Sequence, residues 1–528
     1  MSVLSKTRET QRSMSNPFSR LATAKAALLM TGSTYVSFFF GLVVSALIAR
    51  AVGPEDFGRY AYIVWISGVL VQIGNNGLNT TGIRFISESL GRGSKRTARS
   101  VHGWLLRLQY LCLIAVAVGF LVTMPLTIPK GWNANVVLFV GVVLVSVIAK
   151  TFFLFDVSVA KGYGHFAVEA FSNMSVSAVN MVCVLALFYF RAPLAAYLIL
   201  FCVTSAAYSI VVWRMLKARR IKPSARELDE ALAPRMKNHL IWTVLLAIAA
   251  ALGNKSSETY LLSTHVGPAE VGFFTIAAAL TRGGVELLSA GLNSVLMPLM
   301  GHGFGAGGTE RVNAILADAV RFFTFAGLLL AGVGFMWADV AVMLMYGAQY
   351  QPVTVVFQVM VLVAGVTLSQ GAFGAMLSTT DKQQIRAYVA VLSVVLSVVA
   401  ALLLVPRYGL AGAVAAHVIS SLVIYLLIGV GIVRVFAVHL PWAQLSRLLL
   451  AAAVAAAVAA ACHWADPGLV LRFVGGMLYA LVFISASLLF KAWKGEDIAQ
   501  LMPLAQRFPR ALGWALPYLS RYAKRAGS

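Results

Sequence analysis

The sequence predicts an all-α integral membrane protein of about fourteen transmembrane helices, and three observations lead to this prediction. Of its 528 residues, 60% are hydrophobic and only 12% are charged, whereas soluble domains are about 45–50% apolar and about 25% charged. Apolar stretches recur roughly every thirty to forty residues, and most are long enough to cross a hydrocarbon core of ~30 Å. Lysine and arginine gather in alternate connections between these stretches, as the positive-inside rule requires.

The apolar stretches are expected to be helices because a helix satisfies its own backbone in lipid. Residues 26–49, 192–213 and 408–433 contain no aspartate, glutamate, lysine or arginine. A transmembrane barrel would show segments of about ten residues with alternating hydrophobicity instead. The expected spans are 26–50, 60–88, 102–124, 134–156, 167–190, 194–216, 239–263, 272–301, 313–338, 353–380, 386–405, 409–433, 446–464 and 470–491.

The distribution of basic residues supports this number of spans independently. With a cytoplasmic N-terminus, thirty of the 42 lysines and arginines fall on the cytoplasmic side, six on the opposite side and six within spans. Such a bias predicts that both termini are cytoplasmic. The net charge of +23 is then explained by topology and by anionic membrane lipids as partners. Nucleic-acid binding is not expected, because the basic residues are scattered over separate short segments.

Neither a metal site nor a cofactor is expected. The four cysteines, Cys112, Cys183, Cys202 and Cys462, lie in or at the ends of apolar spans and have no C-x-x-C spacing. Buried small hydrophobic residues are the better interpretation of them.

Two segments 214 residues apart resemble each other and predict an internal repeat. Residues 51–60 (AVGPEDFGRY) align with 265–274 (HVGPAEVGFF), and residues 77–80 (GLNT) align with 291–294 (GLNS). Each Gly-Pro pair, Gly53-Pro54 and Gly267-Pro268, is expected to form a turn between two spans on the outer side. Six spans separate the copies, so the repeats run parallel in the membrane.

The repeat therefore predicts two parallel six-helix lobes around a central cavity, followed by an additional helix pair. The expected divisions are an N-tail (1–25), an N-lobe (26–216), a basic cytoplasmic linker (217–238), a C-lobe (239–433), the additional pair (446–491) and a basic tail (492–528). That tail carries basic and aromatic residues and is expected to lie in the cytoplasm or at the inner membrane surface.

Three short blocks resemble the polysaccharide flippase family of the multidrug/oligosaccharidyl-lipid/polysaccharide exporter superfamily. Residues 48–60, which include Gly53, Pro54 and Gly58, resemble the pattern R-x-L-G-P-E-x-F-G-x-Y. Residues 346–350 (YGAQY) resemble F-G-x-x-Y, and residues 405–413, with Pro406 and Gly409, resemble P-x-Y-G-x-x-G-A. The resemblance covers about residues 25–435.

The resemblance implies a transporter, not an enzyme, in the bacterial cytoplasmic membrane. It implies alternating access and a polyprenyl-diphosphate-linked oligosaccharide as substrate, moved to the outer leaflet for O-antigen or exopolysaccharide synthesis. A polysaccharide polymerase and a chain-length regulator are further partners that it implies. The last two spans lie outside the repeat, and two roles are open for them, a lipid groove and peripheral packing.

Ionisable residues deep in a span are costly and usually face a cavity or a partner. Lys255 with Glu258, and Arg282 with Glu286, lie deepest and are spaced to share a helix face. The functional interpretation places the substrate diphosphate on Lys255 and Arg282, with Glu258 and Glu286 in coupling or gating. The alternative is local neutralisation of charge.

Nearer the cytoplasmic side, Arg84 with Glu88 and Asp318 with Arg321 repeat this spacing. Arg84 is a further candidate for substrate binding, because it is the last residue of the segment 77–84, which resembles the pattern of the same family. Asp318–Arg321 is expected to be structural. Lys150 is placed close enough to the inner boundary to reach the interface.

Two other classes of protein remain as alternatives. A cation-coupled multidrug exporter of the same superfamily would need buried acidic residues, and spans one and two contain none deeper than Glu88. A membrane glycosyltransferase or polysaccharide polymerase would need catalytic or metal-binding acids on a sizeable outer loop, and the outer loops are short.

Overall fold

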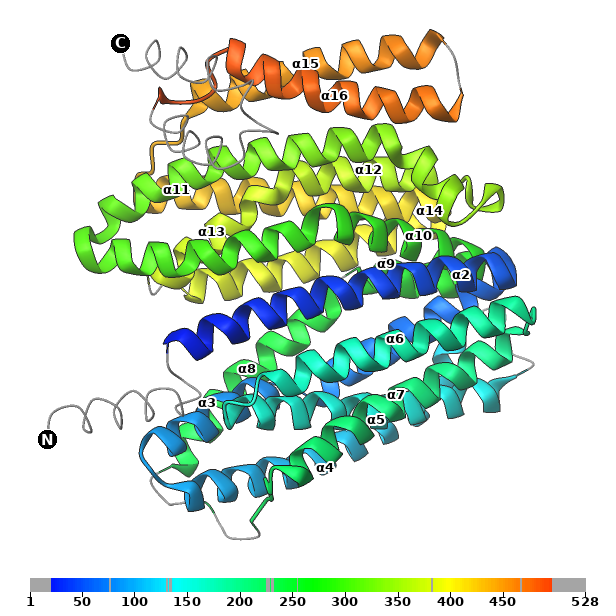
Figure 1. The fold of residues 1–528 in the computed structure, drawn as a ribbon, viewed down its shortest axis with the longest axis vertical. Helices are drawn as coiled ribbons and strands as arrows, with labels where there is room; N and C mark the ends of the chain where they lie inside the picture. The colour runs from blue at the N-terminus through cyan, green and yellow to red at the C-terminus, as the bar shows by residue number, and fades with distance from the viewer. Residues whose placement is uncertain are drawn as a thin grey trace, which may run out of the picture. The chain divides into compact units, whose positions relative to one another are not determined.

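The computed structural model describes residues 20–75, 77–129, 132, 135–224, 228, 232–253, 255–380, 383–465 and 468–495. Within these ranges the chain forms helices and short connections and no strand (Figure 1). Eleven of the described helices are long and apolar enough to cross a membrane. The predicted all-α membrane fold is therefore confirmed. The predicted cytoplasmic or interfacial tail (492–528) lies outside the described residues except for its first four residues, 492–495.

The first half of the chain contains six long helices and one shorter helix. They are α2 (Arg20–Asn75), α3 (Leu78–Gly91), α4 (Lys95–Thr127), α5 (Val136–Gly162), α6 (Ala167–Tyr189), α7 (Leu194–Ala218) and α8 (Ala233–Gly253). The second half is more interrupted. It contains α9 (Ser256–Leu261), the π-helix η1 (Leu262–Val266), α10 (Pro268–Thr281), the π-helix η2 (Arg282–Glu286), α11 (Leu287–Met345), the 3-10 helix η3 (Ala348–Tyr350), α12 (Val353–Val366), the 3-10 helix η4 (Thr367–Ser369), α13 (Gln370–Thr379), α14 (Gln383–Phe436), α15 (Trp442–Ala465) and α16 (Leu469–Leu489).

Glycines explain why continuous helices and predicted spans do not correspond one to one. Helix α14 covers two predicted spans and α2 covers one span and the first part of the next, and they break at Gly409 and Gly53, whose φ values are 56° and 80°. Only glycine adopts such φ values at little cost. Conversely, the predicted span 60–88 is divided between α2 and α3 by Gly77, with φ 74°. The helical conformation is interrupted at Gly53 and at Gly409.

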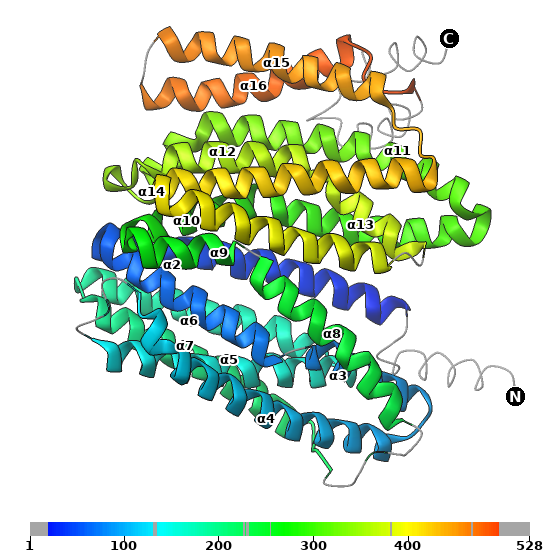
Figure 2. The ribbon, with the colours of Figure 1, turned by 180° about the vertical axis from the view of Figure 1, so that it is seen from behind.

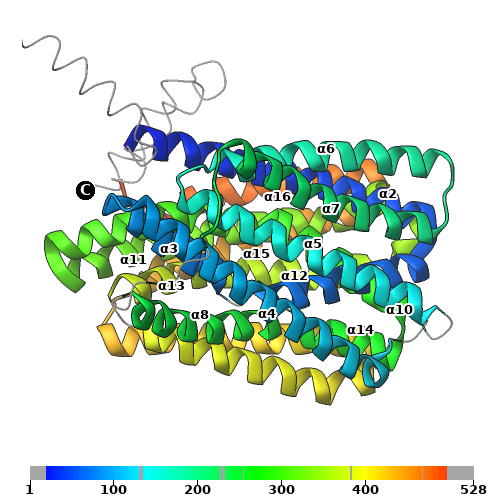
Figure 3. The same cartoon turned by 90° about the horizontal axis from the view of Figure 1, so that it is seen from below.

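The described helices form two compact units. The first contains residues 1–276, 345–352 and 390–420, and the second contains 277–344, 353–389 and 421–528. In the first unit α5 packs along α7, as Figure 3 shows, α2 packs against α5 and α6, and α8 packs against α3, as Figure 2 shows from behind. The predicted lobe boundaries at 216 and 239 remain a prediction.

The two copies of the predicted repeat meet directly inside the first unit. Gly58 and Gly272, which occupy equivalent positions in the two copies, face each other, and a Cβ on Gly272 would lie 3.3 Å from the Cα of Gly58. A Cβ on Gly58 would overlap the carbonyl of Pro268. Gly58 lies within the helical part of α2 rather than in the turn, so the turn role expected for it is wrong. Its position requires glycine because two backbones approach closely.

Tyr350, from the second motif block (346–350), contacts both copies of the repeat beside this approach. Its hydroxyl donates a hydrogen bond of 2.7 Å to the carbonyl of Ala49. Its ring stands edge-on to Phe57 and Phe273 at centroid distances of 6.2 and 6.1 Å. Gly409 faces Val266, the residue before the second Gly-Pro pair. The short blocks that carry the family resemblance therefore gather at one place in the first unit.

We expect Gly58→Ala to destabilise the protein by about 1–3 kcal/mol, because overpacking between two backbones leaves no flexible side chain to move. The measurement is the thermal stability of the purified full chain in detergent. Gly68→Ala is the matched control on the same helix, since nothing lies within 4 Å of an added Cβ there. Equal stability of the two variants would contradict the close approach.

The additional C-terminal helices belong to the second unit, where α15 and α16 lie side by side (Figure 1). Ala451, Ala455 and Ala459 are buried along α15, as their spacing of four residues allows. From α16, the Tyr479 hydroxyl donates a hydrogen bond of 3.1 Å to the carbonyl of Leu328 on α11. The ring of Tyr479 occupies the space that a side chain at Gly332 would need. The pair is thus packed firmly against α11.

The contacts of Asp318 and Arg321 within the second unit agree with the structural role expected for these two residues. Arg321 is fully buried, and its Nη2 lies 3.3 Å from Asp318 Oδ1. Lys494 Nζ, which follows α16, lies 3.0 Å from the same oxygen. A second ion pair joins Asp339 to Arg472. These pairs connect α11 to the C-terminal helices.

Candidate functional site

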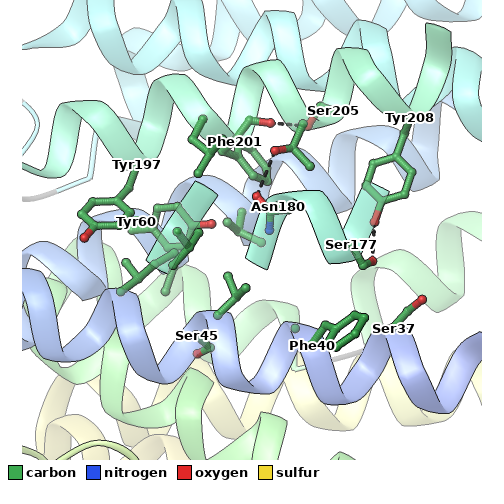
Figure 4. A pocket seen from close by; sticks show the side chains of 18 of the residues that line it. Ser37, Phe40, Ser45, Tyr60, Ser177, Asn180, Tyr197, Phe201, Ser205 and Tyr208 are labelled. Carbon is green, nitrogen blue, oxygen red and sulfur yellow. Dashed lines mark hydrogen bonds between the residues drawn. The ribbon is translucent and has the colours of Figure 1, made fainter. Parts of the chain in front are cut away.

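A cavity of about 550 Å³ lies inside the first unit between α2, α5, α6 and α7. Ser37, Phe40 and Ser45 lie along α2, and Tyr197, Phe201 and Tyr208 come from α7 (Figure 4). Hydroxyl, amide and aromatic groups dominate the lining. A mostly apolar pocket with a few polar groups is typical of a small-molecule site.

Two polar pairs order the wall formed by α6 and α7. Thr204 Oγ1 donates a hydrogen bond of 3.0 Å to Asn180 Oδ1. The hydroxyls of Ser177 and Tyr208 lie 2.7 Å apart and point toward each other in Figure 4. Polar groups are thereby held in place at the cavity wall.

Lys150 is the charged residue that lines this cavity, and no carboxylate is among the described residues that line it. Its Nζ lies 4.0 Å from the centroid of the Phe201 ring, which is a cation–π contact. A second cavity of about 550 Å³ is also lined by Lys150 and Tyr208, together with Asn75 and Asn173. Lys150 and Tyr208 therefore line both cavities.

Lys150 lies nearer to the middle of its helix than the predicted span 134–156 places it. The predicted span ended at 156, but α5 continues to Gly162, so Lys150 is near the middle of the helix. The charged residue beyond the predicted end, Lys161, is neutralised by Glu169 at 2.6 Å, which lets the helix continue. The sequence shows a lysine within this apolar segment. Because the predicted span ends six residues too early, it places Lys150 near the end of the helix and not near its middle.

Lys255 lies at a break in the predicted seventh span. Helix α8 ends at Gly253 and α9 begins at Ser256, with Lys255 in the left-handed conformation at φ 59°. A side chain there costs about 1 kcal/mol or more, and such strain gathers at functional sites. The Lys255 side chain is half-buried. Interrupted membrane helices are also typical of transporter binding sites.

Glu258 lies one turn beyond Lys255 and is 1% exposed. Ser397 Oγ, from α14, donates a hydrogen bond of 2.9 Å to its Oε1, and Ser257 Oγ donates one of 2.9 Å to its Oε2. Both carboxylate oxygens are therefore engaged. Glu258 joins the broken segment to α14 within the first unit.

The other two predicted charges belong to the second unit. Arg282 begins the π-helix η2 and Glu286 ends it, and both side chains are exposed. Short π-helical turns often occur at functional sites.

Arg84 has a partner different from the one that its spacing indicated. Its Nη1 lies 3.2 Å from His239 Nδ1 on α8. Glu88 instead accepts from Arg92 at 2.6 Å and from Arg235 at 3.0 Å. Arg84 is thus part of the contact between α3 and α8 and is partly engaged there.

Long apolar helices that enclose cavities with polar groups, and charges at interrupted segments, are typical of multi-pass membrane transporters. The fold and the site therefore define this class of protein. A family model described as "Polysaccharide biosynthesis protein" matches residues 23–304, more than half of the chain. The chain therefore belongs to this family. Comparison with curated proteins gives no match.

Solved structures with the same fold are flippases and exporters. A lipid II flippase MurJ in an inward closed conformation superposes with a TM-score of 0.71 at 13% identity, over 88% of this chain and 98% of the flippase. An inward-facing MATE family multidrug transporter gives 0.66 at 15% identity, over 76% of this chain and 95% of its own. The eukaryotic MATE transporter AtDTX14 gives 0.56 at 14% identity, over 78% and 96%. These identities show a shared fold.

Proposed function

We propose that the protein moves polyprenyl-diphosphate-linked oligosaccharides from the inner to the outer leaflet of the bacterial cytoplasmic membrane, by alternating access, for synthesis of a surface polysaccharide. The observation that carries the proposal is the family match over residues 23–304. The fold shared with a lipid II flippase over 88% of the chain supports it. The family name refers to polysaccharide synthesis and the name of the solved structure to the flipping of a lipid, and a lipid-linked saccharide is the substrate that we propose from the two together.

The charges support an anionic substrate rather than a cationic drug. Lys150 lines two cavities of the first unit, and the described residues that line these two include no carboxylate. Cationic drugs would need an acidic partner in such a site. The MATE likeness extends over less of the chain than the flippase likeness. The multidrug exporter is therefore the weaker alternative.

In this proposal Lys255 and Arg282 bind the diphosphate, and Arg84 is a third candidate. A guanidinium donates two parallel hydrogen bonds to phosphate, and an ammonium acts as a compact charge. Glu258 and Glu286 are the candidates for coupling or gating. Anionic lipids are proposed partners at the basic cytoplasmic segment where Lys95, Arg96 and Arg99 line a small cavity.

The test is deletion of the gene, with surface polysaccharide and cytoplasmic-leaflet lipid-linked oligosaccharide measured separately. We expect surface polysaccharide to disappear and the lipid-linked units to accumulate on the inner side. Plasmid-borne wild-type protein should restore export. Increased drug sensitivity with intact polysaccharide would favour the multidrug exporter and reject the flippase.

The proposed topology has fourteen spans and two cytoplasmic termini. Alkaline phosphatase fused after Gly53, Pro268 or Pro467 should be active, because the enzyme folds only outside the cytoplasm. Fusions after Lys217 and at Ser528 should be inactive. The split of thirty basic residues against six underlies this expectation. An active fusion at Ser528 would show an odd number of spans and reject the topology.

A further inference from the structure

The mid-helix position of Lys150 creates an electrostatic problem. An ammonium removed from water loses several kcal/mol of hydration even after the protein relaxes. The cation–π contact with Phe201 contributes only about 0.5–2 kcal/mol. Asp156 is the next acidic residue on α5. It follows Lys150 by six residues, so its side chain lies about 120° around the helix from that of Lys150. An additional anionic group would balance the charge.

The groups beside Lys150 favour a saccharide over a small inorganic ion. Asn180, Ser177 and Thr204 offer amide and hydroxyl groups on one wall, and sugar hydroxyls use such donors and acceptors. The rings of Tyr60, Phe201 and Tyr208 supply flat apolar faces. A volume of about 550 Å³ is within the range of small-molecule pockets and far exceeds that of a single ion.

We infer that this cavity binds a sugar unit that carries a carboxylate, with Lys150 as its counter-charge. The Asn180 amide and the paired hydroxyls of Ser177 and Tyr208 bind the sugar hydroxyls. The inference rests on the proposed flippase function and specifies its cargo: the transported oligosaccharide contains an acidic sugar.

The test is equilibrium binding of radiolabelled D-glucuronate to the purified full chain in lipid nanodiscs. Lys150→Gln should raise the Kd about tenfold or more, because a hydrogen bond to a charged group is worth about 1.5–3 kcal/mol. Lys150→Arg should stay within about threefold of wild type. Lys217→Gln is the matched control, since Lys217 also lies over an aromatic ring, at 5.0 Å from Trp213, but outside the cavity.

A second variant keeps the test decisive if Lys150→Gln does not fold. Asn180→Asp places a negative charge in the cavity, so it should weaken glucuronate binding about tenfold, by repulsion and by competition for Lys150. Unlabelled D-glucose and acetate serve as competitors. Each should displace less of the radiolabelled glucuronate than unlabelled glucuronate does at the same concentration. Displacement by acetate at equal concentration would overturn the saccharide assignment. Absence of glucuronate binding, or unchanged binding by Lys150→Gln, would overturn the inference.

The gene deletion separates this inference from the proposed function. If deletion abolishes polysaccharide export but glucuronate does not bind, only the acidic-sugar inference fails. If deletion leaves export intact, the flippase proposal fails, whatever the binding result.

Discussion

Lys255→Ala and Arg282→Ala are each expected to reduce surface polysaccharide by more than tenfold while the protein still accumulates in the membrane. The reason is that each removes a cation proposed to hold the substrate diphosphate. Arg282→Lys should restore export only in part, because lysine keeps the charge and loses the planar fork. The measurements are protein level and exported glycan in a deletion strain. Arg311→Ala is the control, since Arg311 is an exposed arginine of the second unit, to which Arg282 also belongs.

The double variant Arg282→Ala with Glu286→Ala distinguishes binding from local neutralisation. If the two residues only neutralise each other, the single changes leave one charge unpaired and lower the amount of folded protein. The double change should then restore both protein level and export. If Arg282 binds substrate, export stays abolished in the double variant. Restored export would therefore reject the substrate role of Arg282.

Glu258→Gln is expected to abolish export without lowering the amount of protein. Glutamine keeps an oxygen that accepts from Ser397 and an amide beside Ser257, so the packing around the 1% exposed side chain is retained. The charge that we propose for coupling is lost. Glu258→Ala should additionally reduce folded protein, because it leaves both serine hydroxyls without this partner, at about 1–3 kcal/mol each.

The matched control for Glu258 is Glu310→Gln, because Glu310 is an exposed glutamate. It should leave protein level and export unchanged. Normal export by Glu258→Gln would show that Glu258 has a packing role alone, and the coupling assignment would then be rejected.

Hydropathy and charge predicted the class of fold because the membrane imposes length and polarity on every span. The repeat predicted the turns at Gly53 and Gly267, since a Gly-Pro pair dictates a local backbone conformation. The breaks at Gly77 and Lys255 could not be predicted in this way. Both lie in short polar runs, GNNG at 74–77 and GNKSSE at 253–258, inside spans that hydropathy treats as continuous. Glycine and asparagine favour such breaks, but the overall hydropathy of each span concealed them.

The candidate cavity was the least predictable part of the molecule. Asn180, Tyr208 and Lys150 come from three separate helices, and only their packing brings them to one space. In the sequence Asn180 is a polar residue within a predicted span, and a hydrogen bond between helices would explain it as well as a ligand would. The structure shows both features, because Asn180 accepts from Thr204 and also lines the cavity.

The contact between Gly58 and Gly272 has a mechanical consequence. Interdigitated side chains would have to separate before two helices could rotate past each other, whereas two glycine backbones present smooth surfaces. Movement at this point therefore requires little repacking, and the resistance comes from the Tyr350 hydrogen bond to Ala49 and from the rings beside it. The paired glycines therefore allow the two helices to move against each other, and the contacts of Tyr350 restrain that movement.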